Sequence, residues 1–368
     1  MKYPWKVMLA SAVVASMLLT GCRSTSDTNT NNTGSASETQ TTSSTTNSST
    51  EPVSQEIFAM DTAMIITAYG DNAQKGVTDA IAEIERLDNL LSIGKENSEI
   101  SKLNKSGSAA LSDDTAVMVT KALDLYKSTG GAFDITVLPL MELWGFTTQD
   151  YYVPTEDEIQ STLQRVGADK LTWDESTKTL TLGDNQEIDL GGIAKGFTSS
   201  RIMEIFKKDG VTCGMVSLGG NVHLLGTKQD GSEWRVGIKD PDNTDTDDML
   251  GVLETDDCAV ITSGAYERNF EKDGVTYHHI IDPATGKPSN SGLTSVTIVS
   301  KDGTLADGLS TSLFVMGKDK AIAYWKQHAD EFDTILVDKD RNVYITEGIA
   351  DGFAPDSVSA DQVQTIHK

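Results

Sequence analysis

The stretch DLGGIAKGF, residues 189–197, places three glycines, one carboxylate and one lysine within nine residues. An ordinary buried strand would avoid the glycines, and an ordinary exposed helix would avoid both the glycines and the apolar flanks. The pattern is typical of a strand-to-helix turn, because glycine adopts backbone conformations that other residues resist. A phosphate cradle is the alternative, but the stretch fits neither G-x-G-x-x-G nor G-x-x-x-x-G-K-[ST]. Alone, it predicts a turn.

Hydrophobic periodicity on both sides of this turn predicts a mixture of helices and strands. Their alternation is irregular, so we expect an α+β fold with mainly antiparallel sheets packed with helices, and not a doubly wound parallel fold. The chain is long enough for one large domain or two interlocked lobes. The expected strands include 61–70, 211–218 and a closing pair over 333–346, and the expected helices are 76–92, one capped by Ser112, 193–208 ending at Gly210, 307–316 and 321–328.

The N-terminus, MKYPWKVMLASAVVASMLLTGC, is typical of an exported lipoprotein. Lys2 and Lys6 precede an apolar run that is too short to span a membrane comfortably. The run ends at LTGC, which matches the lipobox of bacterial lipoproteins. We therefore expect a signal peptide over 1–21, a lipidated Cys22 and a lipid-anchored protein on the extracytoplasmic side of the cell membrane. An ordinary secretory signal with a chance cysteine is the alternative.

Composition narrows the remaining possibilities. Residues 22–55 are nearly all Ser, Thr, Asn, Gly, Asp and Glu, which predicts a disordered tether before a globular domain over 56–368. The net charge of −25 would repel a phosphate backbone, so nucleic-acid binding is not expected. Cys213 and Cys258 lack metal-ligand spacing and are expected to be buried free thiols, with a disulfide as the alternative.

Six stretches occur in a characteristic order after the lipobox: GGAFDITVLPLMELWGF, DLGGIAKGF, SLGGNVHLLG, TSGAYERNF, HHIIDPATGKP and ADGLSTSLFVMG. From Phe58 to the C-terminus, this series closely resembles the FAD:protein FMN transferase family, also called thiamine-biosynthesis lipoproteins. The resemblance implies an α+β domain of two interlocked lobes. It also implies Mg²⁺-dependent transfer of FMN from FAD to a threonine hydroxyl of an acceptor protein, with release of AMP. Acceptors of similar enzymes are NADH:quinone oxidoreductase-type subunits and exported FMN-binding domains.

The last stretch offers a metal site. Asp307 and Thr311 are four residues apart, so they are neighbours on one face of the expected helix. A carboxylate and a hydroxyl are hard oxygen ligands of the kind that Mg²⁺ prefers. From the helix alone, a capping aspartate and a surface threonine explain the pair at least as well. The resemblance implies that both bind Mg²⁺ together with the main-chain carbonyl of Gly192, with Ala194 as a close alternative.

The resemblance also implies the residues that bind FAD. Asp189 would accept hydrogen bonds from the flavin or ribityl groups, and Lys195 would lie near the phosphates, although some relatives carry glutamate there. Relatives have an aromatic residue where Ile93 and Gly94 stand, so no stacking platform is expected from that loop. The other expected cofactor contacts are Met60, Ala132, Phe133 and Asp134.

The histidine pair supplies the expected proton acceptor. Adjacent histidines in a strand often have no task, and no third ligand indicates zinc. The resemblance places His279 beside the flavin phosphate, where a near-neutral pKa would suit a group that takes the proton of the attacking hydroxyl. His278 would face away, because successive strand residues point to opposite sides. The expected catalytic residues are therefore His279 and Asp307.

Two other functions fit the same sequence. An FAD pyrophosphatase would use the same site with water in place of threonine, giving FMN and AMP. A tethered flavin-binding lipoprotein would need no catalytic group at all, and would leave the Asp307–Thr311 pair and the HHIIDP stretch without a purpose.

Overall fold

The computed structural model describes residues 51–243 and 248–368. The predicted signal peptide, the lipidation site Cys22 and most of the predicted tether lie outside the described residues. Within the described part of the chain, none of the helices combines the length and the apolar character that crossing a bilayer requires.

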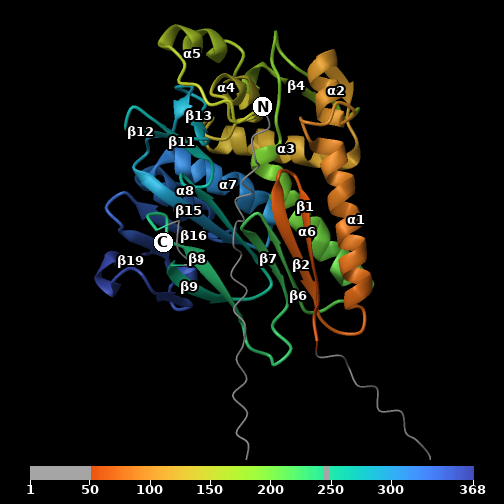
Figure 1. The fold of residues 1–368 in the computed structure, drawn as a ribbon, viewed down its shortest axis with the longest axis vertical. Helices are drawn as coiled ribbons and strands as arrows, with labels where there is room; N and C mark the ends of the chain where they lie inside the picture. Colours follow the sequence, from red (N-terminus) through yellow and green to blue (C-terminus); the bar gives the residue numbers. More distant parts are fainter. Residues whose placement is uncertain (1–50, 244–247) are drawn as a thin grey trace, which may run out of the picture.

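A nine-stranded sheet forms the centre of the fold (Figure 1). Its neighbouring strands are antiparallel except for β17 and β19, which run parallel. This arrangement confirms the predicted α+β class with mainly antiparallel pairing. In spatial order the strands are β1 (Val53–Ala59), β2 (Thr62–Ala68), β6 (Gly214–Leu218), β7 (Asn221–Leu225), β10 (Ala259–Gly264), β15 (Leu293–Ser300), β16 (Asp333–Asp338), β17 (Val343–Thr346) and β19 (Val363–Ile366).

The first hairpin begins earlier than expected. All seven residues of β1 pair with β2, so the ordered domain starts at Val53, within the stretch that composition assigned to the tether. Met60 and Asp61 form a two-residue turn with φ of 48° and 58°. Positive φ at both positions is the signature of a type I′ turn, whose twist matches that of paired strands.

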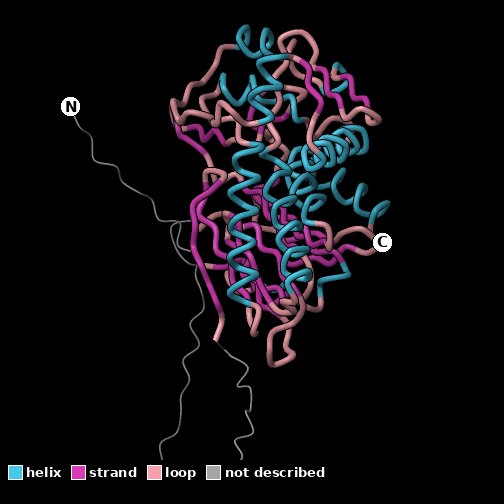
Figure 2. The backbone as a smooth tube through the Cα atoms, turned by 90° about the vertical axis from the view of Figure 1, so that its right-hand side faces the viewer, coloured by secondary structure: helices cyan, strands magenta, loops and turns pink. Residues whose placement is uncertain are grey.

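Helices cover this sheet, as the view in Figure 2 shows. α6 and α7 lie side by side against the strands, and α1 packs on α6. The long helices are α1 (Ala73–Leu91), α3 (Asp113–Ser128), α6 (Gly191–Asp209), α7 (Gly303–Met316) and α8 (Lys318–His328). The short ones are α2 (Glu99–Ser106), α4 (Leu138–Leu143), α5 (Glu156–Leu163) and α9 (Glu347–Ala350).

Helix ends agree closely with the local sequence signals. α6 ends at Gly210, which adopts the left-handed conformation with φ of 81°, as predicted. α3 begins after Ser112 as predicted, but the serine side chain does not cap it. The Ser112 hydroxyl donates to the carboxylate of Glu99 instead, at 2.9 Å.

The chain between α1 and α6 builds a second lobe above the sheet, and part of the C-terminal half packs onto it (Figure 1). Ile281 of β13 packs in one apolar cluster with Leu140, Trp144 and Ile159 of the upper lobe. The indole of Trp144 donates to the carbonyl of Gly286 at 2.9 Å. The smaller sheets are β3 (Ser108–Ala110) with β4 (Thr172–Asp174) and β5 (Thr179–Thr181); β8 (Trp234–Lys239) with β9 (Met249–Thr255) and β18 (Phe353–Pro355); β11 (Asn269–Lys272) with β12 (Val275–His278); and β13 (Ile281–Asp282) with β14 (Lys287–Pro288).

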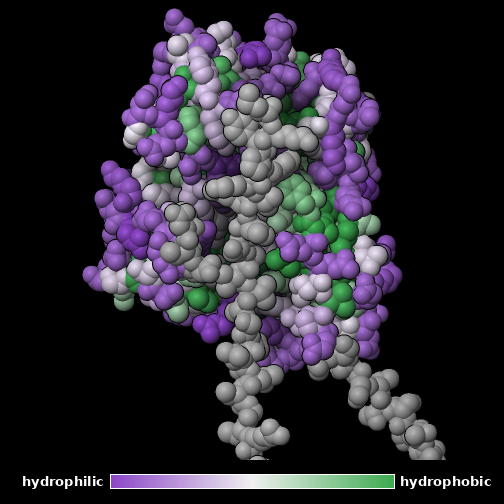
Figure 3. All heavy atoms as spheres, viewed as in Figure 1, coloured by the Kyte–Doolittle hydropathy of each residue, from purple (hydrophilic) through white to green (hydrophobic). Residues whose placement is uncertain are grey.

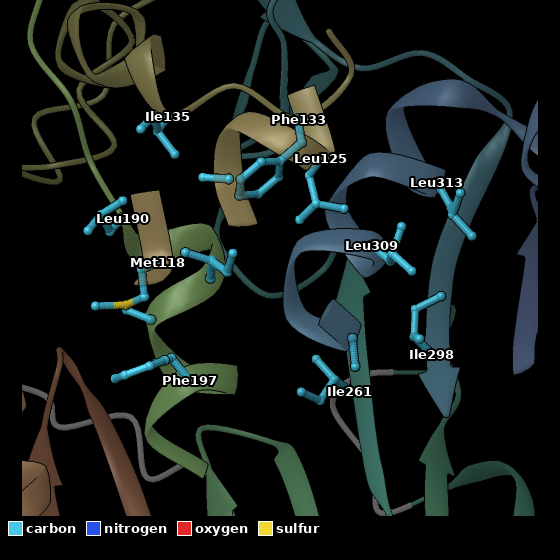
Figure 4. Close-up of a cluster of buried hydrophobic side chains, with 14 of the residues drawn as sticks. Met118, Leu125, Phe133, Ile135, Leu190, Phe197, Ile261, Ile298, Leu309 and Leu313 are labelled. Atoms are coloured by element: carbon cyan, nitrogen blue, oxygen red, sulfur yellow. The ribbon is translucent and has the colours of Figure 1, made fainter. Parts of the chain in front are cut away.

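One hydrophobic cluster joins α3, α6 and α7 to the sheet (Figure 4). Phe197 of α6 and Leu309 of α7 enter it from neighbouring helices, and Ile261 of β10 enters it from the sheet. Burial of these side chains fixes α6 against α7. Cys213 and Cys258 are free and buried, as expected, and burial raises the pKa of the Cys258 thiol to about 11.

The face shown in Figure 3 is mostly hydrophilic, in keeping with the strongly acidic composition. On the face shown, apolar residues gather over β1 and β2 beside α1.

Candidate active site

Helices α6 and α7 make their closest approach at Gly196. A Cβ atom at this position would lie 2.0 Å from the carbonyl oxygen of Gly303 and 2.5 Å from Cβ of Asp307. No other residue fits, so the last glycine of DLGGIAKGF is required by the crossing of the two helices. The crossing brings the backbone of the first turns of α6 directly to the side chain of Asp307.

Asp307 is a buried carboxylate, 4% exposed, and neither a cap nor a surface residue. The cap of α7 is Asp302, which accepts from the amides of Thr304 and Leu305. Oδ2 of Asp307 accepts from the amide of Gly196 at 2.8 Å, and Oδ1 accepts from the side chain of Asn221 at 3.0 Å. Burial raises the pKa of Asp307, while the positive charge of Lys195 opposes that rise.

The carbonyl of Gly192 and the carboxylate of Asp307 are both possible acceptors for the amide of Gly196. In a regular helix, the amide of Gly196 would donate to this carbonyl, four residues earlier. Because that amide donates to Asp307, the Gly192 carbonyl has at most a shared partner. A main-chain carbonyl that can share its amide donor with a buried carboxylate forms, with that carboxylate, the kind of oxygen pair that a small cation needs.

Further oxygens line the same side of α7. The hydroxyl of Thr311 lies 3.3 Å from that of Ser263, which in turn bonds Ser310 at 2.8 Å. The described residues contain no group of three or more His, Cys, Asp or Glu side chains close enough to hold a metal by themselves. An ion here would rely on Asp307, neutral oxygens and substrate phosphate, which is the usual way in which Mg²⁺ is bound. The donor set fits Mg²⁺.

Asp189 and Lys195 lie at the start of α6. Oδ1 of Asp189 accepts from the amide of Gly191 at 2.9 Å. Burial raises the pKa of Asp189, and the charges of Lys195 and Arg268 act against this. The charge of Lys195 also acts on Asp307 and His279, so these groups lie near one another around the first turn of α6.

His279 is held by the backbone of Arg268. Its amide donates to the Arg268 carbonyl at 2.9 Å, and Nδ1 lies 3.3 Å from the same oxygen. A carbonyl oxygen only accepts, so Nδ1 carries the proton and Nε2 is left as the unprotonated nitrogen. Burial first, and then the positive charge of Arg268, lower the pKa of His279 to about 3. The predicted near-neutral pKa is therefore wrong for the ligand-free chain.

His278 points to the opposite side of the strand. Its Nε2 lies 3.0 Å from the carbonyl of Ser289, and its ring meets Phe314 edge-on at 5.5 Å. Its Nδ1 is buried without a partner among the described residues. The two histidines therefore have different surroundings, as the strand alternation predicts.

Met60 reaches α6 from the first hairpin. Its left-handed backbone directs the side chain toward Thr198, whose hydroxyl lies 3.8 Å from the sulfur. The next residue, Asp61, has the same backbone conformation, and its charge contributes to raising the pKa of Asp189. The turn thus lies beside α6, and the cofactor contact of Met60 stays a prediction.

The GGAFD segment packs against the other side of the α6 turn. Phe133 is a core residue, and a Cβ on Gly192 would lie 3.1 Å from its ring. Asp134 is buried, and its oxygens accept from Thr136 and from the amide of Ala168 at 3.0 Å. These bonds make Asp134 a structural cap, and the flavin contacts of Asp134 and of half-buried Ala132 stay predictions.

Four residues that contact or lie near the predicted site residues were not predicted from the sequence: Asn221, Ser263, Glu267 and Arg268. They lie in SLGGNVHLLG and TSGAYERNF, two stretches that the resemblance singled out without giving them a chemical role. Desolvation of its carboxylate raises the pKa of Glu267 to about 7, and the positive charges of Lys195 and Arg268 oppose this rise.

A separate hollow of about 540 Å³ lies at the turn between β13 and β14, and Asp282, Lys287 and Ser289 are among the residues that line it. None of the predicted site residues lines this hollow. We therefore assign the site from the hydrogen bonds at the α6–α7 crossing.

The fold is an antiparallel α+β domain in which the crossing of α6 and α7 gathers oxygen donors beside Lys195, an arrangement suited to a class of protein that handles phosphate groups. The sequence pattern of the ApbE family matches residues 60–336, and the chain belongs to this family. This finding confirms the resemblance drawn from the six stretches.

Relatives match over most of their length. A protein of Vibrio cholerae named FAD:protein FMN transferase is 36% identical over 262 residues, covering 68% of this chain and 78% of the relative. One of Treponema pallidum with the same name is 32% identical over 319 residues, covering 81% and 88%. The crystal structure of the ApbE protein of Thermotoga maritima superposes with a TM-score of 0.76 at 33% identity, covering 81% of this chain and 98% of that one. The flavin transferase ApbE of Vibrio cholerae gives 0.71 at 31% identity, covering 84% and 98%.

Proposed function

We propose that this protein transfers FMN from FAD to a threonine hydroxyl of an acceptor protein and releases AMP, with Mg²⁺ as the required metal. The observation that carries the proposal is the Gly196–Asp307 bond, which joins the DLGGIAKGF turn to α7 and gathers the oxygen donors beside Lys195. The relatives named FAD:protein FMN transferase support the same reaction.

The chain's own residues would bind and orient the pyrophosphate. Asp307, Thr311 and the carbonyl of Gly192 would hold Mg²⁺, which supplies Lewis-acid polarisation of the phosphorus and neutralises charge on the departing AMP. Lys195 would lie against phosphate oxygens as a point charge. The first turn of α6 would offer its backbone amides to the phosphates, as helix N-termini do, while Gly192 leaves room for the ring of Phe133 behind it.

His279 would take the proton. The threonine oxygen forms a bond to the FMN-side phosphorus, and the bond from that phosphorus to the bridging oxygen breaks. AMP leaves with the electron pair, and the hydroxyl proton passes to Nε2 of His279, the nitrogen that the Arg268 carbonyl leaves unprotonated. No covalent enzyme intermediate is needed.

One experiment separates this function from its alternatives. The purified chain is incubated with FAD, Mg²⁺ and a flavoprotein domain that carries a target threonine. Protein-bound FMN supports transfer, free FMN without bound FMN supports an FAD pyrophosphatase, and unchanged FAD supports a binding protein. Changing the target threonine to valine should abolish the protein-bound FMN.

We further propose that the protein acts at the outer side of the cell membrane, anchored through Cys22, on NADH:quinone oxidoreductase-type subunits or exported FMN-binding domains. The lipobox at the end of a short apolar run supports the anchor. Cys22→Ser should release the protein from membranes or block its maturation. Equal membrane retention of mutant and wild type would refute the anchor.

A further inference from the structure

The β11–β12 hairpin carries an apolar stripe that starts at His279. Residues two apart on a strand share a face, so Val275, Tyr277 and His279 lie on the same side of the hairpin. Phe270 pairs directly with Tyr277 across the hairpin, and the two rings stack with centroids 5.3 Å apart. Both rings are half-buried, because they pack at the edge of the apolar cluster that contains Trp144. The stripe therefore runs from His279 along the edge of this cluster to the tip of the hairpin, which projects beside α4 and α5 in Figure 1.

The segment between α4 and α5 extends the stripe with two more aromatic rings. The ring of Phe146 lies edge-on to that of His279, with centroids 6.5 Å apart. It also lies edge-on to that of Tyr151, with centroids 5.8 Å apart. Tyr151 stacks on Phe270 at 4.8 Å with ring planes only 11° apart. Each ring in the series is thus fixed by a neighbour, and the series leads from the imidazole outward to Tyr151.

The outer part of this stripe is exposed. Among the described residues, five large hydrophobic side chains are exposed, and three of them belong to these two segments: Tyr151 at 41%, Tyr152 at 41% and Val275 at 49%. The other two, Phe58 and Val117, lie on β1 and α3. Exposed tyrosines on rigid supports are typical of the centre of protein–protein interfaces.

We propose that the stripe formed by Tyr151, Phe270, Tyr277 and Val275 is the docking surface for the acceptor protein. The partner is the segment around the target threonine, whose flanking apolar side chains pack on the stripe while its hydroxyl reaches Nε2 of His279. The proposal rests on the proposed transferase function, because only a macromolecular acceptor needs a surface that continues outward from the proton-accepting group.

The test measures two substrates separately in the full chain. Tyr151→Ala should raise the KM for a threonine-bearing flavoprotein domain about tenfold or more, since truncating a central aromatic anchor usually costs at least that much in binding. The KM for FAD, and the slow release of FMN to water without acceptor, should stay within about twofold of wild type. Val275→Ser at the hairpin tip should act in the same direction, and Tyr151→Phe should keep wild-type kinetics.

Val117→Ser is the matched control, because it removes an equally exposed apolar side chain from α3 and should change neither KM. An unchanged acceptor KM in both Tyr151→Ala and Val275→Ser, with melting temperatures near wild type, overturns the proposal. A rise in the KM for FAD in Tyr151→Ala also overturns it, because the stripe would then be a flavin platform. A rise in the acceptor KM in Phe58→Ala without one in Tyr151→Ala overturns it too, because the acceptor would then dock on β1. If wild type transfers no FMN to the acceptor domain, the proposed function fails and not the surface alone.

Discussion

Replacing His279 tests the chemistry of the site most directly. His279→Asn keeps a donor near the Arg268 carbonyl but removes the basic Nε2. Loss of a general base typically slows a reaction by about a hundredfold to ten-thousandfold. We expect kcat for transfer to fall within that range, while the affinities for FAD and Mg²⁺ stay near wild type, because the histidine is needed in the transition state and not for holding the pyrophosphate.

The pH dependence follows from the lowered pKa. The reaction needs the neutral imidazole, and a folded-state pKa of about 3 keeps it neutral to far lower pH than its ordinary value of 6.5 would. Activity that depends on His279 is therefore lost only as the pH falls through about 3 in the free chain. The profile of kcat/KM for FAD should show no limb from this residue between about pH 5 and 8. Bound phosphate is negative and raises the pKa, so the limb in kcat should lie at higher pH than the limb in kcat/KM.

The assay is single-turnover formation of protein-bound FMN over a range of pH, with His278→Asn as the control. That variant loses the contact to Ser289 and should melt at a lower temperature, yet transfer FMN at a rate near wild type. The reasoning fails if His279→Asn transfers FMN at the wild-type rate, or if His278→Asn is the inactive variant.

Three further changes test the proposed metal ligands and the residue that orients one of them. Asp307→Ala should abolish turnover at saturating Mg²⁺ and also lower the free energy of unfolding by about 1–3 kcal/mol, because two buried donors lose their acceptor; activity comparable to wild type would refute the metal assignment. Asn221→Ala should raise the Mg²⁺ concentration for half-maximal FAD binding about tenfold to a hundredfold, because Asn221 orients the carboxylate of Asp307. Ser312→Ala is the control, since it removes a buried hydroxyl from α7, the helix of Asp307, and should leave that concentration unchanged. Thr311→Val should weaken Mg²⁺ binding less than Asp307→Ala, since water can replace one neutral ligand, and calorimetric Mg²⁺ titrations would rank the two.

Local signals were enough to predict several elements. The glycine at 210 ends α6 through its own backbone conformation, and the strand at 62–68 follows from a short apolar run. The predicted capping role of the Ser112 side chain was wrong, because its hydroxyl bonds to Glu99, thirteen residues earlier, and not to the helix amides. A competing partner of this kind is invisible to a reading of the helix alone.

The site itself depends on contacts between distant residues. From the helix sequence alone, Asp307 fits a cap or a surface residue. Its burial depends on Gly196, which lies 111 positions away in the chain and donates to its carboxylate. Asn221 was invisible as a site residue for the same reason, since its partner is 86 positions away. The pKa of His279 depends first on burial and then on the charge of Arg268, and the sequence of the histidine pair predicts neither.

The first hairpin has a mechanical consequence. The chain enters the domain at Val53, at the lower end of the hairpin in Figure 1, whereas the turn at Met60 and Asp61 lies at the upper end beside α6. Seven residues at about 3.3 Å each separate these ends by about 23 Å. A pull on the segment before Val53 therefore loads the β1–β2 ladder in shear, so that its hydrogen bonds share the force along the whole strand. The turn beside α6 is the last part of the hairpin to which this force is transmitted.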